Sequence, residues 1–92
     1  MEHDVTEERA HQVRTRFELA VGRMMDAWLT AHRIEVTATD VQLACEFLVE
    51  SGWTVHDAPL ARLRVVTNDG HEEEITREAA VLMAVRRLAS RR

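Results

Sequence analysis

Residues that could bind a metal ion occur at helical spacing near the start of the chain. His3, Glu7 and His11 are four positions apart, so a helix that began this early would place them on one face. Imidazole and carboxylate groups are ordinary zinc ligands, but structural zinc sites use four well-anchored ligands. Three residues at a chain terminus make a poor site. We therefore expect no metal ion and no other cofactor.

Nucleophilic side chains are few. Cys45, the single cysteine, would need a neighbouring base and partial exposure to react, yet its neighbours are apolar and we predict a small buried hydrophobe. Ser51 and Ser90 are the only serines, and neither belongs to a nucleophile motif. The three glycines form no phosphate-binding loop. The sequence predicts a protein that is not an enzyme.

The composition is that of one small globular domain spanning residues 1–92, with 46% hydrophobic and 30% charged residues. A lone cysteine excludes an intrachain disulfide and fits a reducing compartment. The acidic N-terminus lacks the apolar run of a secretory signal, and no apolar stretch is long enough to cross a membrane, so we expect a cytoplasmic protein. All twelve basic residues are arginine, which indicates GC-rich coding and hence a bacterium or its phage.

The first element that would position these side chains is a long helix, predicted from Asp4 to Arg33. Asp4 and Glu7 have the spacing of a capping box. Apolar residues recur within one stripe at 3.6 residues per turn. The stripe contains Ala10, Val13, Phe17, Ala20, Val21, Met24, Trp28 and Ala31.

A second, shorter helix is predicted to begin at Thr39, which forms a capping-box pair with Gln42, and to stop at Gly52. Its main apolar face is widened by Leu43 and Cys45, so we expect cover from two sides. The main face comprises Val41, Ala44, Phe47 and Leu48.

A β-hairpin and a third helix follow. The run 60–67 alternates with period two, and the turn Asn68–Gly70 predicts a hairpin in which Gly70 is left-handed. In this register Leu63 and Ile75 pair on the buried face. The other predicted pairs are Thr67 with His71, Val65 with Glu73, and Arg64 with Glu74. Thr76 caps a helix that continues to Ser90, and residues 53–59 are predicted to be an irregular extended connection.

The predicted fold is α+β, a small domain with the order α-α-β-β-α. It has a long N-terminal helix, a central second helix, and a two-stranded antiparallel hairpin before the C-terminal helix, packed on the first and third helices. A two-stranded hairpin alone is marginally stable. Residues 34–36, residues 53–55 or the hairpin of a partner copy could supply a third strand.

The element order from Thr39 to Ser90 is similar to that of a winged-helix DNA-binding domain, which is the alternative function. The charges oppose it, because residues 34–76 contain nine acidic residues and two arginines. Residues 77–92 contain one acidic residue and five arginines, so a basic contact patch is possible there. It would comprise Arg86, Arg87, Arg91 and Arg92.

The length of the first helix favours protein–protein contact. At 1.5 Å per residue it would span about 43 Å, whereas a compact chain of this size has a diameter of roughly 32 Å. Either the helix bends near Gly22 or its apolar stripe continues onto another subunit. We give equal weight to the alternative that the large apolar residues of this helix belong to the core of the domain. The candidate interface comprises Phe17, Val21, Met24, Met25, Trp28 and Leu29. We expect a non-catalytic interaction or regulatory protein, a homodimer, with a bacterial or phage protein as a further partner.

Overall fold

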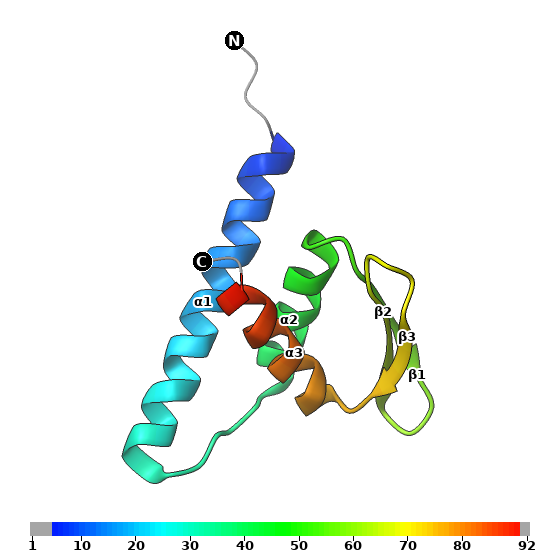
Figure 1. Cartoon of the computed structure of the whole chain (residues 1–92). Coiled ribbons are helices and arrows are strands. Elements are labelled where there is room, and N and C mark those ends of the chain that lie inside the picture. Colours follow the sequence, from blue (N-terminus) through cyan, green and yellow to red (C-terminus); the bar gives the residue numbers. More distant parts are fainter. Residues whose placement is uncertain (1–4, 91–92) are drawn as a thin grey trace.

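The chain folds into three helices and one antiparallel sheet, in a computed structural model that describes residues 5–90 (Figure 1). The predicted α+β class is confirmed, but the sheet has three strands, not two. In chain order the elements are α1 (Val5–Ala31), α2 (Ala38–Glu50), β1 (Thr54–Ala58), β2 (Arg62–Val66), β3 (Glu72–Ile75) and α3 (Arg77–Ser90).

Helix α1 is continuous and does not break at Gly22. Its 27 residues correspond to about 40 Å at 1.5 Å per residue, close to the longest dimension of the molecule, 48 Å. Only its middle is anchored, because Val13, Phe17, Ala20 and Met24 are buried whereas the residues towards both ends are mostly exposed. The predicted cap at Asp4 lies outside the described residues.

Helix α2 begins two residues earlier than predicted. Thr37, not Thr39, is the N-cap: its hydroxyl accepts from the Asp40 N–H at 3.1 Å, and Asp40 Oδ2 accepts from the Thr37 N–H at 2.9 Å. A carboxylate at the third helical position closes the capping box in place of the expected glutamine. The helix ends as predicted before Gly52, which adopts a left-handed φ of +98°.

Residues 53–59, predicted to be an irregular extended connection in which residues 53–55 were one candidate for a third strand, contain that strand. β1 pairs antiparallel with β2, and the sheet order is β1-β2-β3. The two strands are joined by a tight turn in which the Arg62 N–H donates to the Pro59 carbonyl at 3.3 Å. Its central residues, Leu60 and Ala61, both have positive φ, at 62° and 57°. That is the geometry of a type I′ turn, which Asn and Gly normally occupy.

The β2–β3 hairpin has the predicted register. Leu63 pairs with Ile75, Arg64 with Glu74 and Val65 with Glu73, and the Thr67 N–H donates to the His71 carbonyl at 2.9 Å. Gly70 is left-handed at φ +88°. Leu63 and Ile75 are buried, and Thr76 Oγ1 accepts from the Ala79 N–H at 3.1 Å, which confirms the cap of α3.

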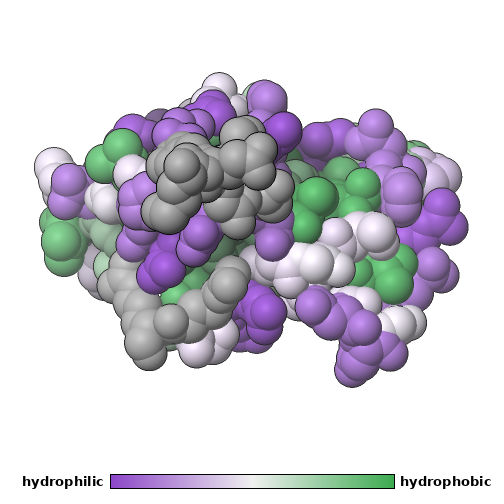
Figure 2. Space-filling view, turned by 90° about the horizontal axis from the view of Figure 1, so that it is seen from above, coloured by the Kyte–Doolittle hydropathy of each residue, from purple (hydrophilic) through white to green (hydrophobic). Residues whose placement is uncertain are grey.

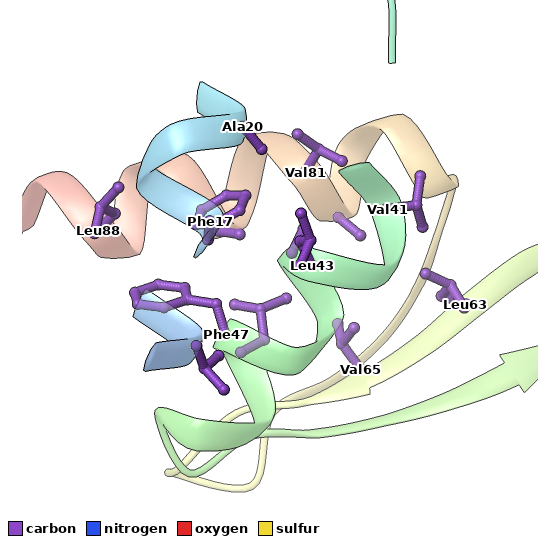
Figure 3. Packing of buried hydrophobic residues seen from close by; sticks show 14 of the residues in the cluster. Phe17, Ala20, Val41, Leu43, Phe47, Leu63, Val65, Val81 and Leu88 are labelled. Atoms are coloured by element: carbon purple, nitrogen blue, oxygen red, sulfur yellow. The ribbon is translucent and has the colours of Figure 1, made fainter. Parts of the chain in front are cut away.

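The core surrounds α2. One side of α2 packs on α1, where the rings of Phe17 and Phe47 stack with centroids 5.2 Å apart, and another packs on α3. The sheet lies against α2 and α3. The predicted packing of the hairpin on α3 is confirmed, whereas α2 takes the place that was expected of α1. Figure 3 shows Leu63 and Val65 of β2 facing α2 on one side, and Phe17 and Ala20 of α1 on another side of the same helix. α2 is therefore contacted by α1, by α3 and by the sheet.

Candidate protein interface

The structure divides the predicted interface residues into two groups. Phe17 and Met24 are buried in the core, and Val21 is half-buried against it. Met25, Trp28 and Leu29 are exposed. We refer to Val21, Met25, Trp28 and Leu29 as the α1 patch.

The α1 patch is a continuous stripe beside the face that α1 turns to the core. Successive helical residues are 100° apart, so positions 21, 25, 28 and 29 fall on one side of the helix. Leu19, also exposed, projects from a different side of α1. Large apolar side chains grouped in this way, in contrast to single exposed ones, are typical of a contact surface.

Trp28 is held in place by the end of α1. His32, with a left-handed φ of 56°, terminates the helix and donates its N–H to the Trp28 carbonyl at 2.8 Å. The two rings meet edge to face with centroids 6.1 Å apart. Trp28 keeps 45% of its surface exposed, so it is not an ordinary core residue.

An ion pair fixes this end of α1 to the start of α2. Arg23 donates to Asp40 Oδ2, and the Asp40 carboxylate is almost fully buried. Burial alone would raise the pKa of Asp40, but hydrogen bonds from Arg23 and from the Thr37 backbone and hydroxyl outweigh it and lower that pKa. The pair therefore ties α1 to the start of α2 next to the first residues of the α1 patch.

Cys45 is half-buried on α2. Burial raises the pKa of its thiol, and Arg77 offsets that effect only in part. A nucleophilic cysteine requires the opposite shift, because the thiolate is the reactive form.

The spacing of His3, Glu7 and His11, from which no metal site was expected, includes His3, which lies outside the described residues. Among residues 5–90, no three His, Cys, Asp or Glu side chains are grouped so that they could hold a metal ion. Over the same range no helix has the length and apolarity needed to span a bilayer.

The elements that would contact DNA in a winged helix are acidic where they are exposed. Glu72, Glu73 and Glu74 are all exposed on β3, and Asp69 is exposed at the turn before it. Such a strand would repel phosphates. In the possible basic patch, Arg86 is exposed and Arg87 is half-buried, whereas residues 91 and 92 lie outside the described part of the chain.

Sequence reasoning missed a groove of 670 Å³ bounded by α1, α2 and β1. The residues of α2 that line it include Ala38, Val41, Cys45 and Val49, spaced three or four apart. That spacing was visible in the sequence as part of the apolar face of α2. The groove itself was not, because the strand that forms its far wall was predicted to be irregular.

Comparison with known protein families, with curated proteins and with solved structures found no match to this chain.

Proposed function

We propose that the protein is a non-catalytic interaction or regulatory protein of a bacterium or phage, acts in the cytoplasm, and forms a homodimer through the α1 patch. The observation that carries the proposal is the exposure of Met25, Trp28 and Leu29 at the end of a helix that extends beyond its own core. Large, adaptable side chains of this kind are enriched at interfaces.

A second copy of α1 fits this surface because the stripe is self-complementary. Val21 and Trp28 are seven residues apart, as are Gly22 and Leu29, which is the spacing along the seam of a helix pair. In an antiparallel pair with its two-fold axis at Met25, Leu29 lies opposite Val21 of the partner subunit. A symmetric contact of this kind uses the same patch on both copies.

The same register places Trp28 opposite Gly22 of the partner subunit. A glycine inside a helix costs roughly 0.5–1 kcal/mol relative to alanine. No heavy atom lies within 4 Å of a Cβ built at Gly22, so packing within the chain does not require glycine there. A bare backbone opposite the indole gives the ring space to pack, and a dimer supplies the reason for glycine at this position.

Charge substitution at the two-fold axis tests the proposal. Met25→Lys would place two ammonium groups against each other in the dimer, whereas in the monomer the exposed side chain simply enters solvent. We expect sedimentation equilibrium to show a dimer for the parent and a folded monomer for Met25→Lys. Leu19→Lys, an exposed position away from the α1 patch, is the matched control and should remain dimeric. A parent protein that is monomeric at all concentrations contradicts the proposal.

A further inference from the structure

The groove lies on a different part of the molecule from the α1 patch. Its α1 wall comes from residues 9–16, whereas the patch begins at residue 21. Val41 and Cys45 of α2 and Val55 of β1 form an apolar floor that continues to the exposed Val49. Figure 2 shows hydrophobic surface near the centre of the molecule, with the helices on one side and the sheet on the other.

The far wall of the groove is formed by β1, an edge strand of the sheet, with Leu63 of the neighbouring β2. Val55, His56 and Asp57 are consecutive and all line the groove, although successive side chains of a strand point to opposite faces. The groove therefore reaches the main chain of β1. On this edge β1 has no neighbouring strand among the described residues, so some of its N–H and C=O groups point outward.

The two edges of the sheet differ in their protection against another strand. β3 carries three exposed glutamates, Glu72 to Glu74, and charge of one sign on an edge discourages strand addition. β1 has a single carboxylate, Asp57, which lies 3.7 Å from Arg77. The edge beside the apolar floor is thus the one without a charge barrier.

The charges that line the groove balance. Three arginines (Arg9, Arg16 and Arg77) and three carboxylates (Glu46, Glu50 and Asp57) border it. The Arg16–Glu46 pair, 3.6 Å apart, and the Arg77–Asp57 pair are already formed. A polyanion such as nucleic acid or a phospholipid surface would gain little attraction from a lining of zero net charge. A segment of low net charge with apolar side chains fits better.

We propose that this groove binds an extended peptide segment of a partner protein, which adds as a strand to the free edge of β1. The main chain of the peptide would pair with β1, and apolar side chains at alternate positions would contact Cys45, Val49 and Val55. Main-chain pairing supplies affinity in this mode, and the contacts of alternate side chains supply specificity.

A displayed library of short random peptides provides the probe. Substitutions at two residues separate binding in the groove from nonspecific hydrophobic binding. Val49 is 51% exposed and lines the groove, whereas Leu82 is 53% exposed and lies outside it on α3. Peptides selected on the parent protein should share an alternating apolar pattern. Their affinity for Val49→Arg should be at least about tenfold lower than for the parent, because one buried apolar contact is lost. Their affinity for Leu82→Arg should equal that for the parent.

Two further measurements locate the peptide. Cys45 is the only cysteine in the chain, so its rate of alkylation by a maleimide reports on the groove floor and should fall when the peptide binds. A peptide with the same sequence but N-methylated at alternate amides should bind at least several-fold more weakly, because it cannot donate to β1.

The proposal is overturned if no selected peptide distinguishes Val49→Arg from Leu82→Arg, or if peptide binding leaves Cys45 alkylation unchanged. It is also overturned if Val49→Arg converts a dimer to a monomer in sedimentation, because the groove is then filled by a second copy. Loss of the dimer in Met25→Lys with peptide binding intact would support the groove and the α1 patch as separate sites.

Discussion

Truncation of Trp28 gives a quantitative test of the α1 patch. The residue retains 45% of its surface exposed. For a tryptophan of roughly 250 Å² this leaves about 110 Å² for a partner to cover. At about 25 cal/mol per Å² this area corresponds to about 3 kcal/mol for each copy. Because both copies lose the ring, Trp28→Ala should raise the dissociation constant of the dimer at least about a hundredfold.

The variant should remain folded, because Phe17 and Met24, which anchor α1 to the core, are unchanged. Sedimentation equilibrium measures the dissociation constant, and circular dichroism melts over a range of protein concentrations provide a second readout. The melting temperature of the parent should rise with concentration, whereas that of Trp28→Ala should not.

Leu19→Ala is the matched control. Leu19 is 72% exposed, belongs to the same helix and projects away from the α1 patch, so its truncation should leave the dissociation constant unchanged. An equal dissociation constant for the parent and Trp28→Ala would refute the assignment of Trp28 to the interface. Equal weakening by both substitutions would indicate an effect on α1 as a whole rather than on the α1 patch.

Three other substitutions have defined outcomes. Gly22→Ala should stabilise the monomer against urea by roughly 0.5–1 kcal/mol, because its Cβ meets open space, and should weaken the dimer in sedimentation; a tighter dimer would exclude the antiparallel register. Asp40→Asn should lower stability at neutral pH by about 1–2 kcal/mol. Because the pKa of Asp40 is lowered in the folded protein, its carboxylate stabilises the fold above about pH 5, and this contribution is lost as the pH falls through the folded pKa. The melting temperatures of Asp40→Asn and the parent should therefore converge in acid. A difference that stays constant with pH would contradict the role assigned to Asp40. Replacing Leu60 by Asn and Ala61 by Gly should raise the unfolding free energy by about 1–2 kcal/mol, since both positions have positive φ, and an unchanged denaturation midpoint would argue against strain in the turn.

The contrast between the two hairpins shows how much of the fold local sequence could predict. The turn at residues 68–70 contains Asn, Asp and Gly, whose backbone preferences specify a tight hairpin, and the register predicted from it is confirmed. The turn between β1 and β2 has the same need for positive φ but places Leu60 and Ala61 there. Pairing of β1 with β2 and the hydrogen bond that Arg77 Nε donates to the Ala61 carbonyl hold that turn against its local preference. No turn signal was therefore present, and residues 53–55 were only one of three candidates for the third strand.

The candidate site was predictable only in part for a similar reason. Periodicity placed Trp28 in the same apolar stripe of α1 as Phe17 and Met24. Such a stripe does not show at which residue the helix leaves the core and its apolar side chains become exposed. That limit is set by the position of α2, which begins at Ala38 after its N-cap Thr37 and is tied to Arg23 through Asp40. Helix faces could thus be derived from sequence, whereas the boundary between core and surface along α1 required the packing of a distant element.

The partial anchoring of α1 has a consequence for the energetics of association. Amides between Val13 and Met24 belong to the packed core and should exchange with solvent only when the whole domain opens, whereas those from Met25 to Ala31 can open by fraying of the last turns. A subunit that docks on the fraying turns must also order them, so part of the binding free energy is spent on helix formation. Affinity then depends on the intrinsic helicity of residues such as Thr30 that need not touch the partner, and can be adjusted without any change at the contact surface.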